Sequence, residues 1–256
     1  MARLNFGIAA VALLLVAPTR AEWAVTGTQT DRGSAAGVEH RRIVLADSVS
    51  GAEARLNLAF FSTKSATLRV IDNPNSRDTL AATMQREQCV AGVNGGYFDP
   101  EGRPVGLLVS DGKLIASRSK ARLLSGVVSV SQGRVQIQRA AEFSNKMKPT
   151  EARQCGPFLL DCGKPIAGLN PTRGARRTFV LTGAGEKAAL GYCSHVTLAQ
   201  LAEILGTPGI AGELKIKRAL NLDGGSSSGF WFNGNDGVFS IREQKRVRDY
   251  LAVVPR

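Results

Sequence analysis

The chain has 256 residues, which is enough for one large domain or two small ones with a substantial buried core. Hydrophobic residues make up 43% and charged residues 21%, as in ordinary globular proteins, so disordered and fibrous classes are excluded. The 33 Lys and Arg residues against 21 Asp and Glu residues give a formal net charge of +12, which favours an anionic partner or substrate.

The first 21 residues have the features of a secretory signal peptide. Arg3 precedes an unbroken apolar stretch from Phe6 to Val16, which is too short to span a bilayer, and no later stretch is long enough. Thr19 and Ala21 are small residues at the two positions that a signal peptidase reads. We therefore expect a mature chain that starts at Glu22 and is secreted or periplasmic.

Residues 22–41 are polar and rich in Gly, Ser and Thr, so we expect a leader or linker before a single domain at 42–256. From there, strand-like runs alternate with turn residues, and this predicts a mostly antiparallel or mixed β-sheet. The runs are 43–45, 56–61, 67–71, 107–110, 113–116, 127–130, 135–138, 158–160, 165–166, 179–181, 188–190, 218–222, 230–234 and 250–254.

Only two helices are predicted. Asp78 is a candidate N-cap for a helix that runs through Met84. Thr197 and Gln200 form a capping box ahead of an apolar stripe, and this second helix ends near Gly206. Few helices among many hairpins indicate an α+β fold.

The four cysteines favour disulfides rather than a metal site. All lie after the predicted signal peptide, and an even number in an oxidising compartment indicates two bridges. Three pairings are possible, of which Cys155–Cys162 with Cys89–Cys193 is favoured because the first two are close in the chain. There is no C-x-x-C pair and no other metal motif, so we predict no metal site and no cofactor.

Three tight loops carry residues that are suited to chemistry. In the loop at 93–99, two glycines permit close approach of the backbone to a ligand, and a ring and a carboxylate follow. At 176–178, a guanidinium can hold an oxyanion through two hydrogen bonds. At 221–229, a carboxylate ends an apolar strand, and the amides and hydroxyls after it can form an anion-binding concavity. Each alone is also explained as an ordinary turn, so the prediction depends on finding all three together.

The third loop also matches the nucleophile elbow G-x-S-x-G over Gly225–Gly229. The α/β-hydrolase fold needs a histidine after that serine, whereas His40 and His195 both precede it. The serine-hydrolase interpretation is therefore rejected. His195 stands just before the second helix, where we expect a capping or surface residue.

The three loops, taken in order, resemble the phosphodiester glycosidase family. The specific segments are Asn-Gly-Gly-Tyr-Phe at 94–98, Arg-Thr at 177–178 and Asn-Leu-Asp-Gly-Gly at 221–225, and the resemblance runs from about Arg42 to the C-terminus. The chain has Ser226 where the family usually has a third Gly, Cys155 where it has the first Gly of Gly-Gly-Pro, and Phe179 where it often has Ala. The resemblance implies hydrolysis of the bond between a sugar's anomeric carbon and a phosphodiester, and the departures bear on substrate scope.

Because a phosphate leaves as a stable anion, the reaction needs charge stabilisation more than strong proton donation. We expect Arg177, with Arg176 as second choice, to clamp the phosphate together with the amides of Gly224, Gly225, Ser226 and Ser227. Asp223 is expected to stabilise the sugar cation, to act as nucleophile or to activate water.

Five residues of the first loop complete the predicted site. Asn94 is expected to bond sugar hydroxyls and Tyr97 to stack on the sugar ring, and Gly95 and Gly96 allow the substrate to approach. Asp99 is the second carboxylate candidate, although its place in a turn before a proline favours a structural role.

An alternative from another class is an exported, non-catalytic module that binds anionic envelope polymers or nucleic acid. The basic clusters at 215–218 and 242–248 support it. Neither cluster is interleaved with aromatic residues, and charge runs are usually solvated faces. We therefore prefer the enzyme, with a carbohydrate phosphodiester as its substrate, either a small molecule or an envelope polymer, and no nucleic-acid partner.

Overall fold

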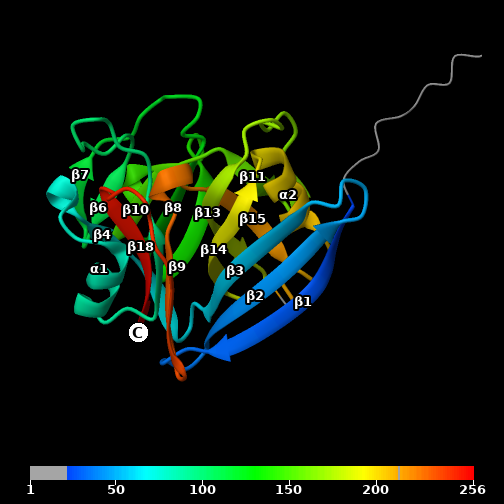
Figure 1. Ribbon diagram of the computed structural model, residues 1–256. Coiled ribbons are helices and arrows are strands. Elements are labelled where there is room, and N and C mark those ends of the chain that lie inside the picture. Colours follow the sequence, from blue (N-terminus) through cyan, green and yellow to red (C-terminus); the bar gives the residue numbers. More distant parts are fainter. Residues whose placement is uncertain (1–21, 213) are drawn as a thin grey trace, which may run out of the picture.

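The computed structural model describes residues 22–212 and 214–256, so the predicted signal peptide at 1–21 lies outside the described residues. The chain forms three antiparallel sheets and two α-helices (Figure 1). The predicted α+β class with few helices is confirmed. In the described ranges, no helix combines the length and the apolar character that a membrane crossing requires.

The largest sheet has eight strands and supplies one wall of the main core. Its order is β1-β2-β3-β14-β13-β15-β11-β12, so strands from both halves of the chain are neighbours in it. Their bounds are β1 Trp23–Arg32, β2 Val38–Asp47, β3 Glu53–Ser62, β11 Phe158–Asp161, β12 Lys164–Pro165, β13 Ala175–Gly183, β14 Lys187–Val196 and β15 Ile216–Asn221.

Two five-stranded sheets complete the β-structure, in the orders β7-β6-β10-β8-β9 and β17-β16-β5-β18-β4. The strands of the first are β6 Leu108–Ser110, β7 Lys113–Ala116, β8 Gly126–Ser131, β9 Arg134–Arg139 and β10 Glu151–Cys155. The strands of the second are β4 Ala66–Asp72, β5 Ala91–Asn94, β16 Phe230–Gly234, β17 Gly237–Ile241 and β18 Asp249–Pro255.

The main core lies where one face of the large sheet meets both smaller sheets. Val180 and Leu190 of the large sheet share this core with Val128 of β8 and with Val93 and Leu251 of the third sheet, and all five are buried. Burial of apolar side chains from all three sheets is the dominant stabilising term, at about 25 cal/mol per Å² of apolar surface removed from water. The ends of β5, β13 and β15 are thereby held together.

Each helix covers an outer face. Helix α2, Leu198–Gly206, packs Leu201, Ile204 and Leu205 on the other face of the large sheet, and its predicted capping box is confirmed. Helix α1, Leu80–Arg86, covers the third sheet, and its N-cap is Thr79 rather than the predicted Asp78. The Asp78 carboxylate pairs instead with Arg86. Three 3-10 turns are also present: η1 Pro74–Ser76, η2 Asn145–Met147 and η3 Gly225–Ser227.

The segment predicted as a leader or linker, 22–41, is instead part of the sheet. Strand β1 pairs with β2 from Trp23 opposite Asp47 to Arg32 opposite Glu39. The prediction was wrong because β1 is an edge strand in which only Trp23 is buried, so its residues lack the apolar alternation of a half-buried strand.

The two predicted disulfides are not formed, and all four cysteines are free thiols. The expected partners lie in different parts of the interior: Cys155 is in the main core, Cys193 is under α2, and Cys89 is in the cluster beneath α1. Cys162 is exposed in the turn between β11 and β12. Proximity in the chain was a poor guide, because Cys155 points into a core that Cys162 does not reach.

The burial of three of the four thiols predicts that these three react slowly. Burial raises the pKa of Cys89, Cys155 and Cys193 to about 12, so the reactive thiolate is scarce at each of them. In a titration with Ellman's reagent, the native protein should release about one equivalent, from Cys162, and the denatured, unreduced protein should release all four. The Cys162→Ser variant should lose the native signal and release three equivalents after denaturation. Fewer than four thiols after denaturation would contradict the free-thiol structure.

A buried acid joins the second and third sheets. Glu151 of β10 is 5% exposed, and its carboxylate accepts hydrogen bonds from the Val70 amide at 2.8 Å and the Asp111 amide at 3.3 Å. Burial is the largest effect on this group, and the pKa of Glu151 rises from 4.5 to about 7. Between pH 4.5 and about 7, Glu151 therefore keeps its proton in the folded protein, whereas in the unfolded chain it has released it.

Stability should accordingly fall as the pH rises from 4.5 through 7, because ionising a buried carboxyl costs free energy only in the folded state. The Glu151→Gln variant should lack this loss, which amounts to about 3 kcal/mol at 1.36 kcal/mol per pKa unit. Urea unfolding at pH 4.5 and 8 measures it, with Glu53→Gln at an exposed position of β3 as the control. Equal pH dependence in all three proteins would remove Glu151 from this role.

Candidate active site

The three predicted loops meet at the ends of β5, β13 and β15. Asn94, the last residue of β5, is 1% exposed and connects them. Its amide nitrogen donates to the Asp223 carbonyl at 2.7 Å, and its side-chain oxygen accepts from the Thr178 hydroxyl at 2.8 Å and the Gly229 amide at 3.3 Å. Thr178 also donates to the Asp223 carbonyl at 2.8 Å. Residues from three distant parts of the sequence are thus within hydrogen-bond distance of one another.

Gly95 and Gly96 lie against a buried ion pair. Arg153 Nε is 3.0 Å from Asp249 Oδ1, and both side chains are fully buried. A Cβ on Gly95 would lie 1.7 Å from Asp249 Oδ1, and one on Gly96 would lie 2.4 Å from the Arg153 guanidinium carbon. Neither position therefore has room for a side chain. The glycines were predicted to allow a ligand to approach, but the group that approaches them is part of the protein.

The same ion pair orders the first loop. Asp249 accepts from the Gly96 amide at 3.1 Å, and its carbonyl accepts from the Gly95 amide at 2.7 Å. Arg153 uses its remaining nitrogens to donate to the carbonyls of Tyr97 at 2.7 Å and Val105 at 3.1 Å. Every one of these contacts fixes backbone between the end of β5 and the start of β6. Sequence reasoning missed both residues, because Arg153 lies in the polar segment Glu151–Cys155, which was not predicted as a strand, and Asp249 directly precedes the strand predicted at 250–254.

Asp223 follows β15 and is partly exposed. Its amide donates to the Gly95 carbonyl at 3.1 Å, and its Oδ1 accepts from the Gly224 amide at 2.9 Å. Burial raises the pKa of the Asp223 carboxyl above its usual value, while the Ser227 hydroxyl and the Gly224 amide lower it by hydrogen bonding. The carboxyl is therefore fixed in position and less acidic than an exposed aspartate. These two properties suit a group that accepts a proton or stabilises a nearby positive charge.

Arg177 lies beside the third loop. It is 8% exposed, its Nε donates to the Val196 carbonyl at 3.1 Å, and its Nη2 donates to the Arg173 carbonyl at 2.6 Å. Its third nitrogen, Nη1, is 3.5 Å from the place where a Cβ on Gly224 would stand. Within residues 22–212 and 214–256 no carboxylate forms an ion pair with it. Burial lowers the pKa of this guanidinium from its usual value, yet arginine stays charged in proteins.

The glycines and serines of the third loop form the turn η3. Gly225 has φ of +67°, a conformation that glycine adopts without strain. The Ser226 carbonyl accepts from the amides of Gln244 and Lys245 at 2.8 and 2.9 Å, which fixes the turn. Ser226 itself is exposed, whereas Ser227 is buried and bonds the Asp223 carboxyl.

Two predicted site residues are committed to local structure. Arg176, the second choice for the phosphate clamp, donates to the carbonyls of Ser228 and Arg242 and lies 5.5 Å from the centre of the Tyr192 ring. The Asp99 carboxylate accepts from the Arg103 amide at 2.8 Å and from its Nε at 2.7 Å, so it closes its own turn. Because each side chain bonds these partners, neither the Arg176 guanidinium nor the Asp99 carboxylate is directed at the Asp223 carboxyl.

Tyr97 lies between the first and third loops. Its hydroxyl donates to the Gly156 carbonyl at 2.7 Å and accepts from the Asn221 side chain at 3.3 Å. Burial raises the pKa of Tyr97, so the hydroxyl keeps its proton. The residue is partly exposed, and its anchored hydroxyl holds the ring in one orientation.

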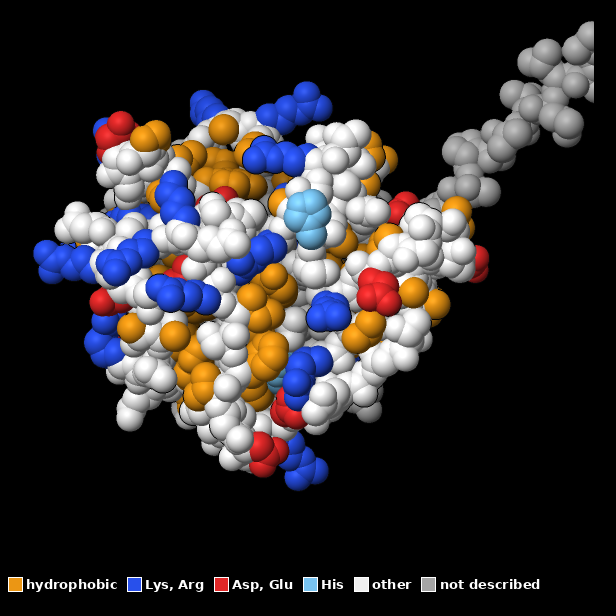
Figure 2. All heavy atoms as spheres, viewed as in Figure 1, with side chains coloured by type: hydrophobic (Ala, Val, Ile, Leu, Met, Phe, Trp, Pro, Cys, Tyr) orange, Lys and Arg blue, Asp and Glu red, His pale blue; other side chains and the backbone are white. Residues whose placement is uncertain are grey.

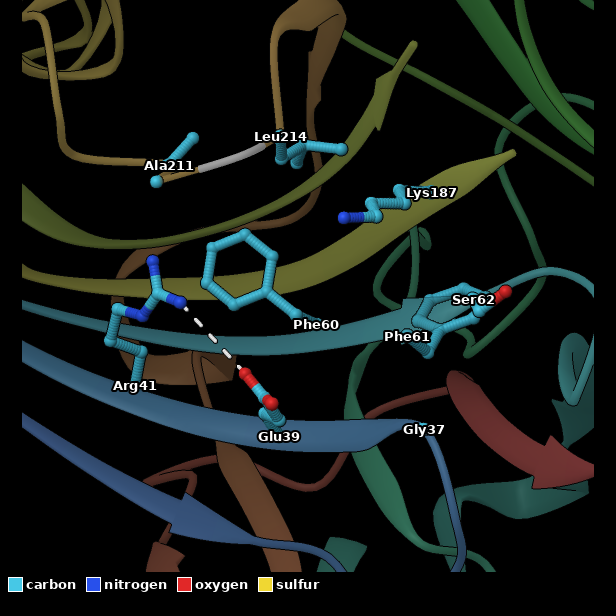
Figure 3. Close-up of a pocket in the computed structure, with 10 residues that line it drawn as sticks. Gly37, Glu39, Arg41, Phe60, Phe61, Ser62, Lys187, Ala211 and Leu214 are labelled. Atoms are coloured by element: carbon cyan, nitrogen blue, oxygen red, sulfur yellow. Dashed lines mark ion pairs between the residues drawn. The ribbon is translucent and has the colours of Figure 1, made fainter. Parts of the chain in front are cut away.

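A separate cavity of about 490 Å³ lies elsewhere on the large sheet (Figure 3). Arg41 and Glu39, two residues apart on β2, form an ion pair at 3.8 Å in its wall, and the Arg41 guanidinium is 4.8 Å from the centre of the Phe60 ring. None of its lining residues belongs to the three loops. No group of three or more His, Cys, Asp or Glu side chains suited to a metal ion is found in the described part of the chain.

The match to a protein-family model identifies the class of protein. The family model for phosphodiester glycosidases matches residues 87–254, which is more than half of the chain and includes all three loops. The chain therefore belongs to the phosphodiester glycosidase family, and its activity is of the glycoside-hydrolase type. A search of curated proteins found no match.

Solved structures share the fold at low sequence identity. The catalytic domain of zebrafish N-acetylglucosamine-1-phosphodiester alpha-N-acetylglucosaminidase, auto-inhibited by its pro-peptide, matches with a TM-score of 0.66 and 18% identity over 90% of this chain and 88% of that one. A hypothetical protein from Synechocystis matches with a TM-score of 0.59 and 15% identity, over 86% and 62%. A putative exported protein from Burkholderia pseudomallei K96243 gives 0.56 and 13%, over 80% and 75%. At these identities the similarity shows the fold.

The buried ion pair predicts a large difference between two neighbouring aspartates. Asp249→Asn should cost about 3–5 kcal/mol of unfolding free energy, because it leaves Arg153 charged and unpaired in the interior. Asp72→Asn, directly across the ladder, removes the partner of Arg248, whose pair is partly exposed rather than fully buried, and should cost less, about 1–2 kcal/mol. Urea unfolding of both variants measures this. Similar small losses would show that the buried pair is not critical.

Proposed function

We propose that the protein hydrolyses a sugar-1-phosphodiester, with Asp223 as the catalytic carboxylate and Arg177 with the amides of η3 as the phosphate clamp. One observation carries the proposal: a partly exposed carboxyl is fixed through its own backbone, and the next residue, Gly224, lies against a guanidinium that has no carboxylate partner among the described residues. Family membership supplies the reaction class.

The chemistry follows from the charges. Water adds to the anomeric carbon, the bond from that carbon to the phosphate oxygen breaks, and the phosphate leaves as an anion with the bonding electron pair. Arg177 and the amides of Gly225 and Ser226 offer positive charge and dipoles where negative charge develops. Asp223 offers negative charge where the sugar becomes an oxocarbenium-like cation, and it serves as nucleophile or accepts the proton of the attacking water.

The other predicted residues divide into positioning and contact roles. Both polar atoms of the Asn94 side chain are engaged by Asp223, Thr178 and Gly229, so we assign it to positioning the loop rather than to sugar hydroxyls. Tyr97 retains the role of a stacking platform, because its hydroxyl is anchored and its ring is partly exposed.

We also propose that residues 1–21 are a signal peptide and that the enzyme acts outside the cytoplasm. The family domain predicted at 42–256 is extended by β1, which pairs along the full length of β2. The basic clusters give the binding-module alternative little support. Of the seven basic residues in the two clusters, Arg218 pairs with Glu142 and Asp161, and Arg248 pairs with Asp72, so carboxylates neutralise two of these charges.

Asp223→Asn tests the mechanism. The variant keeps the size and the backbone contacts of Asp223 but cannot carry negative charge, so kcat should fall by at least about a hundredfold while the melting temperature stays nearly unchanged. The assay uses purified protein and a panel of sugar-1-phosphodiesters, with detection of the released sugar and of its anomeric form. Asp236→Asn, at an exposed turn of the β16–β17 hairpin, is the matched control and should retain full activity. Full activity of Asp223→Asn would exclude the assigned role.

A further inference from the structure

A row of side chains crosses the large sheet toward the candidate site. Direct cross-strand neighbours run from β1 through β2, β3 and β14 to β13. In that order they are Gln29, Arg42, Asn57, Tyr192 and Thr178. At about 4.8 Å between neighbouring strands, four steps span about 19 Å. The row ends at Thr178, whose hydroxyl bonds the Asp223 carbonyl.

The first four residues of this row, Gln29 to Tyr192, line a groove of about 580 Å³ and span about 14 Å over three strand spacings, whereas Thr178 is fully buried beyond its inner end. Its floor includes Gln29, Arg42 and Tyr192, and its wall is formed by Phe239 and Ile241 of β17. In Figure 1, the β16–β17 hairpin stands in front of the large sheet beside β1 to β3. Figure 2, viewed from the same side, shows hydrophobic side chains on this face with Lys and Arg side chains next to them.

The inner end of the groove adjoins the third loop. The Arg176 guanidinium lies over Tyr192, at 5.5 Å from the centre of the ring, and donates to the Ser228 carbonyl just after η3. It also donates to the Arg242 carbonyl, directly after the groove residue Ile241. Arg176 therefore joins the groove to the loop that carries Asp223. This contact gives Arg176 a role, although it does not belong to the phosphate clamp.

The groove offers positive charge that the protein does not neutralise. Arg55 is exposed, and its guanidinium has no partner in the described ranges 22–212 and 214–256. Arg42 pairs with Asp31 at 2.9 Å, but its buried Nε has no hydrogen-bond partner. The Arg42 guanidinium also lies 5.4 Å from the centre of the Phe239 ring. Cations beside apolar side chains suit a ligand that carries negative charge at intervals along its length.

We propose that this groove binds the leaving-group side of the substrate, and that this side is a polymer of further phosphodiester-linked units. The inference rests on the proposed function for its assignment to the leaving group. The argument is one of length and charge: the floor residues Gln29 to Tyr192 extend farther than a single sugar phosphate unit, and Arg176 of β13, Arg55 of β3 and Arg42 of β2 lie on strands that are successively farther from β15 and Asp223. The enzyme then cleaves a chain, with one unit at Asp223 and the next phosphates in the groove.

The test measures binding of a synthetic poly(glycerol phosphate) hexamer to the full chain by calorimetry, with glycerol 3-phosphate as the single-unit comparison. The hexamer has no anomeric carbon, so it is not hydrolysed, and its binding is measured whether or not the protein proves to be a glycosidase. We expect the hexamer to bind at least tenfold more tightly than the single unit. Arg55→Ala should weaken hexamer binding about fivefold, as expected for one exposed charge contact.

The matched control is Arg134→Ala in β9. It removes the same charge from an exposed position that does not line the groove, so hexamer affinity should stay within twofold of the wild type. If Arg55→Ala and Arg134→Ala weakened hexamer binding equally, the binding would depend on the net charge of the protein and not on the groove, and the proposal would be overturned. Equal affinity for the hexamer and the single unit would also overturn it. Binding of dodecyl phosphate without binding of the hexamer would overturn it in favour of a lipid-linked leaving group.

Discussion

The candidate active site depends on one buried ion pair. Arg153 and Asp249 come from the second and third sheets, and they meet at 3.0 Å with neither side chain exposed. Two charges in the interior are costly unless their hydrogen-bonding capacity is filled, and here backbone amides and carbonyls of the first loop fill it. The loop is thus ordered by the same interactions that make the buried charges tolerable.

The buried ion pair explains why the two glycines of the first loop, which the sequence motif makes prominent, are not the residues that take part in the proposed chemistry. Gly95 and Gly96 have no side chain because the ion pair occupies that space, and the Gly95 carbonyl accepts a hydrogen bond from the Asp223 amide. Asn94 and Thr178 hold the Asp223 backbone from the side. Most of the hydrogen-bonding groups in the three loops are used to hold one carboxyl in place, as expected for a preorganised site.

The large sheet links the site to the rest of the molecular surface. Because side chains alternate between the two faces of a strand, one face contributes apolar residues to the core and continues beyond it as the groove floor. The β16–β17 hairpin covers only part of that face. A groove that contains the unpaired Arg55 guanidinium therefore lies on the same face of the sheet, and Arg176 connects it to the loop that carries Asp223.

Local patterns in the sequence determined the hairpins, the capping box at Thr197 and the α+β class, because turn chemistry and side-chain periodicity act between neighbouring residues. The sequence motifs also indicated which loops to examine, with Asp223 and Arg177 among them. The partners of those residues were decided by tertiary structure alone. The Arg153–Asp249 pair leaves no local signal, because its members are 96 residues apart in the chain. The separation of the cysteines leaves none either. Strand β1 is a strand only because β2 lies beside it. Burial and charge pairing depend on which distant residues meet, and only the folded chain specifies that.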